Sequence, residues 1–141
     1  MTIRWTKALS VGIESIDEQH KELFRRAGTF LDGLAGRSRQ DVGILLSYLR
    51  TYAVGHFGDE EEAMREAHYP GYECHRAHHD RFLVDLLALS EEHDRHGGPG
   101  VAQADLGSWV KNWLIEHVSE MDVEMARFFL SRRRMGSAPT L

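Results

Sequence analysis

Two short stretches separated by a turn decide how this chain folds. They read HFGDE at residues 56–60 and HRAHH at residues 75–79, with Pro70-Gly71 between them. Each stretch holds two residues of types that bind metal ions, spaced four apart, and on an α-helix this spacing places both side chains on one face, one turn apart. A turn at Pro70-Gly71 folds the second helix back along the first, so that the two pairs face each other. The pairs are His56 with Glu60 and His75 with His79.

Apolar residues recur at helical spacing in four segments of the chain. We expect a first helix after Ser15-Ile16-Asp17-Glu18, which fits a capping box with Asp17 as a competing cap. Three more helices should begin near Asp41, near Tyr72 and near Ala104 or Asp105, and the last should close at Arg132–Arg134. With no long alternating pattern typical of strands, the chain is predicted to be an all-α, up-down-up-down antiparallel four-helix bundle.

The same reading gives one domain over residues 1–135. Residues 1–14 should form an extended arm lying over the bundle, and residues 136–141 a disordered tail. A single domain argues against a sensor with a built-in output module.

Composition limits the classes of function. The 141 residues are 42% hydrophobic and 28% charged, which is ordinary for a globular protein. No apolar run is long enough to span a membrane, and the polar N-terminus does not resemble a secretory signal, so we expect a cytoplasmic protein. A formal net charge of -5 argues against a nucleic-acid partner. The protein partner, if there is one, is not indicated by the sequence.

Histidine is the unusual component, with nine in the chain. Five of them and two acidic residues fall on the predicted inward faces: His20, His56, Glu60, His75, His79, His117 and Asp122. Seven donors are too many for one tetrahedral zinc ion, and the mixture of imidazole and carboxylate suits iron. If both carboxylates bridge two ions and one solvent oxygen also bridges, about eleven of roughly twelve octahedral positions are filled, which leaves one open for an outside ligand.

One candidate ligand does not fit the pitch of a regular helix. Asp122 follows His117 by five residues, which is about 140° around an α-helix. Either its side chain reaches back, or the helix widens locally into a π-bulge.

The order and spacing of these residues resemble the hemerythrin family, in particular its bacterial members. The resemblance covers about residues 5–130, and includes Trp5, Val11-Gly12-Ile13, Ile16 to Lys21, His56-Phe57, Glu60-Glu61, Tyr69 to Tyr72 and Trp113-Leu114. It implies a non-haem centre of two iron ions joined by an oxo or hydroxo group, with His75, His79 and His117 on one iron, His20 and His56 on the other, and Glu60 and Asp122 bridging. The second iron would carry the open position. The implied oxygen pocket consists of Leu23, Phe57, Trp113 and Ile115.

The resemblance implies reversible binding of dioxygen, for carriage, storage or local delivery, with azide and nitric oxide as alternative ligands. Two other functions stay open: a di-iron enzyme such as a peroxidase, oxidase or nitric-oxide reductase, and an iron-handling bundle. Histidines outnumber carboxylates five to two in the candidate set, which should stabilise high-valent iron less and favours binding over turnover. We therefore expect a protein that is not an enzyme.

The remaining histidines and the cysteine are expected to be unremarkable. His68, His78, His93 and His96 should be surface residues. Cys74, the only cysteine, should be a structural thiol beside His75.

Overall fold

The computed structural model describes residues 3–33, 39–95 and 103–134. Its long helices are α1 (Glu14–Gly33), α2 (Arg39–Glu66) and α3 (Tyr72–Arg95), followed by a fourth rod in three parts. These parts are α4 (Gln103–Glu116), the π-helical segment η2 (His117–Asp122) and α5 (Val123–Arg134). The predicted break at residues 97–100, His96 and the predicted tail all lie outside the described residues.

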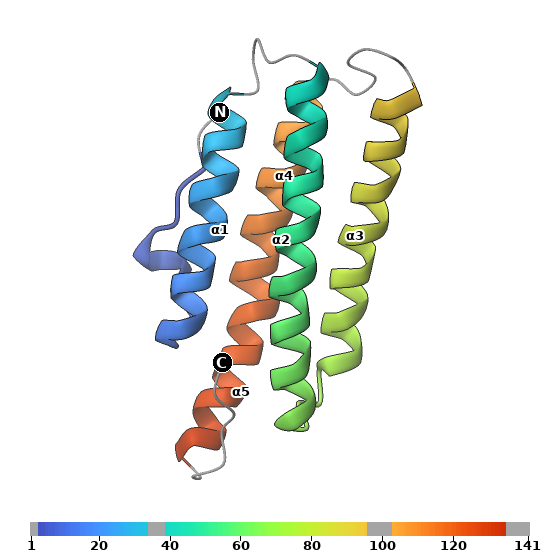
Figure 1. Cartoon of the computed structure of the whole chain (residues 1–141). Helices are drawn as coiled ribbons and strands as arrows, with labels where there is room; N and C mark the ends of the chain where they lie inside the picture. Colours follow the sequence, from blue (N-terminus) through green and yellow to red (C-terminus); the bar gives the residue numbers. More distant parts are fainter. Residues whose placement is uncertain (1–2, 34–38, 96–102, 135–141) are drawn as a thin grey trace.

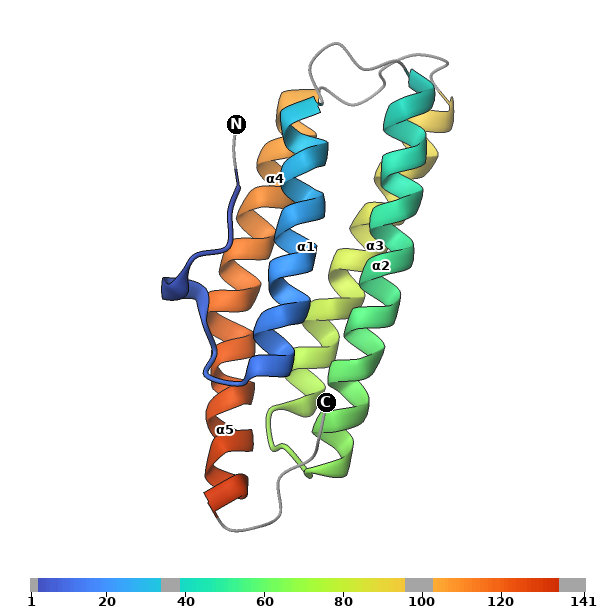
Figure 2. The ribbon, with the colours of Figure 1, turned by 60° about the vertical axis from the view of Figure 1, so that its left-hand side comes forward.

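The rods run alternately up and down, so that neighbours in sequence are antiparallel (Figure 1). From the second viewpoint α4, η2 and α5 form one continuous rod beside α1, while α2 and α3 lie together (Figure 2). Within the described residues there is no strand. The predicted all-α antiparallel four-helix bundle is confirmed. None of the described helices is long and apolar enough to cross a membrane.

The N-terminal arm is held against the bundle, and it is not extended throughout. A short 3-10 turn, η1 (Lys7–Leu9), interrupts it, and Ile3, Val11 and Ile13 are buried. Gly28 of α1 lies so close to the arm that a Cβ there would be 2.9 Å from the carbonyl oxygen of Ile3. The arm therefore closes one side of the bundle by direct backbone contact with α1.

The predicted capping box at Ser15 is wrong, because α1 begins one residue earlier, at Glu14. Asp17 has a different use. Its carboxylate accepts a hydrogen bond of 2.8 Å from the backbone N–H of Val11 and another from the Ser10 hydroxyl. Asp17 therefore ties the arm to the first turn of α1 instead of capping the helix.

The turn between α2 and α3 is tight, as the Pro70-Gly71 signal indicates. The backbone N–H of Tyr69 donates to the Met64 carbonyl at 2.9 Å, and that of His68 to the Arg65 carbonyl at 3.1 Å. His68 has a φ of 55°, so these bonds form the Schellman ending of a helix, with histidine where glycine is the usual residue. This ending fixes where α3 starts its return along α2.

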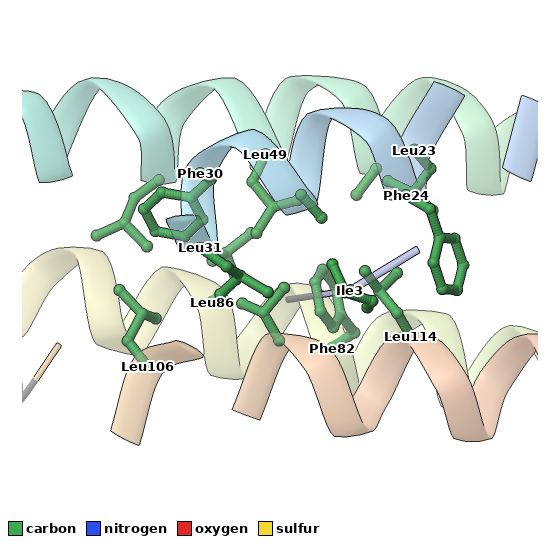
Figure 3. Close-up of a cluster of buried hydrophobic side chains, with 14 of the residues drawn as sticks. Ile3, Leu23, Phe24, Phe30, Leu31, Leu49, Phe82, Leu86, Leu106 and Leu114 are labelled. Carbon is green, nitrogen blue, oxygen red and sulfur yellow. The ribbon is translucent and has the colours of Figure 1, made fainter. Parts of the chain in front are cut away.

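The apolar core consists of two clusters. The larger one fills the end of the bundle away from the α2–α3 turn. It includes Phe24, Phe82 and Leu114, shown with their neighbours in Figure 3. The smaller one, with Met64, Met125 and Phe129, lies toward the α2–α3 turn. Between them on each rod stand the polar residues singled out by the sequence, so the site is enclosed by apolar packing at both ends.

Candidate metal centre

All seven candidate ligands converge at one buried place in the middle of the bundle. His20 comes from α1, His56 and Glu60 from α2, His75 and His79 from α3, and His117 and Asp122 from the two ends of η2. Each is at most 6% exposed. Their ligand atoms form two groups, each with all atoms within 4.8 Å of one another. One group is His75, His79 and His117 with the two acids, and the other is His20 and His56 with the same two acids.

The two acids are shared by the groups because each carboxylate turns one oxygen to each side. On one side Asp122 Oδ1 lies 3.0 Å from Nε2 of both His75 and His117. On the other side Asp122 Oδ2 lies 3.0 Å from His20 Nε2. Glu60 does the same, with Oε1 3.1 Å from His79 Nε2 and Oε2 3.1 Å from His56 Nε2. This division of oxygens is the geometry that a carboxylate bridging two cations requires.

The π-helical segment explains the awkward spacing of His117 and Asp122. In a π-helix the hydrogen bonds join residues five apart, so such residues lie about one turn apart on the same face. Segment η2 begins at His117 and ends at Asp122, and both are buried. Of the two alternatives for this spacing, the structure has the widened helix.

The polar atoms at the centre fit a pair of cations. When Nε2 is unprotonated, as a metal ligand must be, Nε2 of His20, His56 and His75 and all four carboxylate oxygens are buried acceptors without a donor. Nε2 of His79 and Nε2 of His117 face each other at 3.1 Å, an arrangement in which two lone pairs point into the same space unless one nitrogen is protonated. Burying so many unpaired polar atoms is unfavourable unless something of opposite charge compensates them.

The pKa shifts of the buried histidines and carboxylates show that the two kinds of group interact closely. Burial by itself lowers the pKa of His20 and His75, but hydrogen bonds and charges from Asp122 and Glu60 outweigh it and raise both pKa values to about 9. Burial works to raise the pKa of Glu60, yet the charge of His56 and hydrogen bonds from the histidines hold that pKa well below its usual range. Burial and the charge of Glu60 work to raise the pKa of Asp122, but the charge of His117 and hydrogen bonds from His117 and His20 hold it below its usual range. Both acids are therefore ionised, and the site attracts positive charge.

Three of the five histidines have a hydrogen-bonding partner on the ring nitrogen that faces away from the centre. Nδ1 of His56 lies 2.7 Å from Gln19 Oε1, and Nδ1 of His79 lies 2.9 Å from Glu61 Oε2. Nδ1 of His117 lies 2.8 Å from Nδ1 of His78. Such partners fix the orientation of a ligating imidazole.

Sequence reasoning missed these three partners, and for His78 it was wrong. His78 is half-buried and contacts the site, whereas a surface residue was expected. Burial lowers its pKa, as do the neighbouring histidines. Its contact with His117 depends on how α3 is rotated against the fourth rod, which the spacing of residues within α3 does not give.

The four residues of the implied oxygen pocket lie beside different parts of the centre. Phe57 stacks on His79 with ring centroids 3.9 Å apart, and Trp113 stacks on His117 at 4.4 Å, so both aromatic rings border the three-histidine group. Leu23 is buried and stands one turn from His20. Ile115 is half-buried and packs against the core cluster from its edge.

Next to Leu23 a pocket opens between α1 and α2. It is partly open to solvent and has room for about one water molecule, and Leu23, Ala27 and Leu49 are among its apolar lining. Tyr52 also lines it and lies with its ring parallel to that of His56, at a centroid distance of 6.4 Å. The pocket therefore adjoins the two-histidine group.

Two further predictions about single residues are wrong. His93 is 4% exposed instead of lying on the surface, because its imidazole packs against α2 at Gly43. Cys74 is exposed, so it is not a structural thiol of the core. His68 is exposed, as predicted.

Comparisons with known proteins agree with this geometry. The family model described as the hemerythrin HHE cation-binding domain matches residues 11–129. The chain is 29% identical over 119 residues to the bacteriohemerythrin of Methylococcus capsulatus, covering 84% of this chain and 89% of that protein. It is also 29% identical over 118 residues to hemerythrin subunit 1 of Golfingia vulgaris, covering 84% and 85%.

The fold agrees as well. A crystal structure of wild-type hemerythrin superimposes with a TM-score of 0.81 at 28% identity, covering 90% of this chain and 97% of that one. The family model spans most of the chain and includes every residue of the buried polar centre. This chain belongs to the hemerythrin family.

Proposed function

We propose that this protein binds dioxygen reversibly at a di-iron centre and serves in the carriage, storage or local delivery of oxygen. Membership of the hemerythrin family makes it a di-iron, oxygen-binding protein and not an enzyme. The observation that carries the proposal is the pair of ligand groups sharing Glu60 and Asp122, because shared carboxylates hold two ions close together at fixed separation.

Each ion has a distinct set of proposed ligands. His75, His79 and His117 would hold one ion through Nε2, and His20 and His56 would hold the other. Glu60 and Asp122 would contribute one oxygen to each. With one histidine fewer, the second ion is the one left with a free position, and when loaded with iron the centre supplies the reversible oxygen chemistry of the family.

The protein's own contribution is to keep water from the centre. Every proposed ligand is at most 6% exposed, and apolar clusters close the bundle above and below them. Leu23 lines the pocket between α1 and α2 and follows His20 by one helical turn, so it would form the wall on the side of the open position. Exclusion of water supports binding and release without permanent oxidation of the metal.

The test is to prepare the iron-loaded protein and record its visible spectrum in air, after reduction without oxygen, and after oxygen is readmitted. The proposal requires about two iron ions per chain and a band that disappears on removal of oxygen and returns through several cycles. Replacement of Glu60 by Ala should abolish the band, whereas Glu62→Ala, an exposed acid two residues away, should preserve it. Sustained turnover of peroxide or nitric oxide by the same preparation, without a reversible oxygen band, would contradict the proposal.

A further inference from the structure

His78 and His117 are joined edge to edge and nearly in one plane. Their Nδ1 atoms lie 2.8 Å apart, and the planes of the two rings differ by only 4°. The ring centroids are 4.9 Å apart. Two imidazoles that share an in-plane hydrogen bond have centroids separated by roughly the N–N distance plus two ring radii, or about 5 Å. The contact is therefore an aligned hydrogen bond and not a face-to-face stack.

The indole of Trp113 lies flat over both rings. Its centroid is 4.4 Å from that of His117 with planes 12° apart, and 5.1 Å from that of His78 with planes 15° apart. The ring of Phe57 also lies beside that of His117, with centroids 5.9 Å apart. His117 is 2% exposed, while His78 is half-buried at the edge of the bundle. The hydrogen bond is thus covered by an aromatic side chain and shielded from competing water.

The direction of the hydrogen bond follows from the proposed role of His117. An imidazole that gives its Nε2 lone pair to a cation keeps its proton on Nδ1. His117 must then donate from Nδ1, and His78 must accept at Nδ1 and carry its own proton on Nε2. His79 and Glu61 form a similar pair at 2.9 Å, in which a carboxylate is the acceptor.

We propose that His78 is a positioning residue for the metal centre: it accepts the Nδ1–H of His117, and so fixes the orientation and tautomer in which Nε2 of His117 faces Asp122 and the cation. The inference rests on the proposed ligand role of His117. An acceptor on a ligating histidine also makes that ligand a stronger donor. His78 therefore stabilises the more oxidised state of the ion that His117 holds.

Two substitutions separate the hydrogen bond from packing. His78→Phe keeps a flat ring under Trp113 but removes the acceptor, while His78→Asn supplies an amide oxygen close to the place of Nδ1. Both variants and the unaltered protein are loaded with iron. Three quantities are measured: iron per chain, the rate of iron transfer to an excess of a ferrous chelator, and the reduction potential of the centre.

We expect His78→Phe to bind iron but to release it about tenfold faster, in line with the usual loss on removing an outer partner of a ligating histidine. Its reduction potential should rise, and His78→Asn should return both quantities most of the way to their original values. Equal release rates and potentials in all three proteins would overturn the inference, as would a His78→Asn variant that behaves like His78→Phe. Failure of the unaltered protein to hold iron at all would count against the proposed function, and not against the role of His78 alone.

Discussion

Replacing Leu23 by Ala tests how the bundle keeps water away from its centre. Leu23 is 5% exposed and follows His20 by three residues, so it stands one helical turn from a proposed ligand on the same face. Truncation of a buried leucine to alanine costs about 2–5 kcal/mol of folding stability and leaves a cavity. A water molecule takes up roughly 30 Å³ and enters a cavity only where polar groups can bind it.

The cavity at Leu23 would have such groups beside it, since it opens toward His20 and the carboxylates. The matched control is Leu106→Ala, because Leu106 is 2% exposed and belongs to the same apolar cluster. In Figure 3 Leu106 lies at the end of that cluster opposite Leu23 and Leu114. A cavity there is lined by carbon and should stay dry. Both variants should lose similar stability, but only Leu23→Ala should give water access to the centre.

The assay is the decay of the oxygenated band in air, with iron content and thermal unfolding measured on the same samples. We expect Leu23→Ala to decay about tenfold faster, which corresponds to a barrier lowered by roughly 1.4 kcal/mol. Leu106→Ala should decay at the original rate. Ile115→Ala should accelerate decay less than Leu23→Ala, because Ile115 is only half-buried and fills less of the wall. Equal acceleration in the Leu23 and Leu106 variants would show that general loosening, and not local entry of water, controls the decay.

Three further outcomes can be measured. The raised pKa values of His20 and His75, about 9 against 6.5 for ordinary histidine, mean that protonation stabilises the metal-free protein fully below about pH 6.5 and that this stability is lost as the pH rises through about 9. Urea unfolding of the metal-free protein at pH 6 and pH 9.5 should show this loss, and metal uptake near pH 7.5 should release protons to an indicator dye. Asp122→Asn should reduce bound iron, whereas Glu124→Gln, at an exposed position, should not; equal iron in both would refute the bridging role. His68→Gly should raise the unfolding free energy by about 1 kcal/mol by relieving the left-handed backbone at φ 55°, and a lower value would contradict the helix ending described for α2.

The fold could be predicted because two independent periodicities coincide. The apolar stripes give four helices, and the ligand pairs four apart fix which faces of α2 and α3 meet. The start of α1 could not be placed correctly. Asp17 has the sequence position of a helix cap, but its carboxylate accepts a hydrogen bond from Val11 in the N-terminal arm. Local capping signals do not reveal a partner that arrives from outside the helix.

The inward residues could be predicted for the same reason, since their spacing places them on one face. The hydrogen-bonding partners of the outward-facing ring nitrogens could not be predicted. Whether Nδ1 of a histidine meets Gln19, Glu61 or His78 depends on how neighbouring helices are rotated about their axes. The burial of His93 likewise reflects its packing against another helix, at Gly43. Such contacts are set by tertiary packing, and a single sequence carries no direct signal for them.

The π-helical segment is what allows the two groups of ligands to share the carboxylate of Asp122. Asp122 contacts histidines on α1, on α3 and at the start of η2, each at 3.0 Å. A regular α-helix would turn a residue five positions after His117 about 140° away from it, out of reach of at least one of these partners. The π-helical hydrogen bonding of residues 117–122 is less favourable for the backbone than a regular α-helix. We infer that the three contacts of the Asp122 side chain, on three rods, compensate for this cost. If residues 117–122 returned to regular α-helical pitch, the carboxylate would rotate away from His20 and the two groups of ligands would no longer share it.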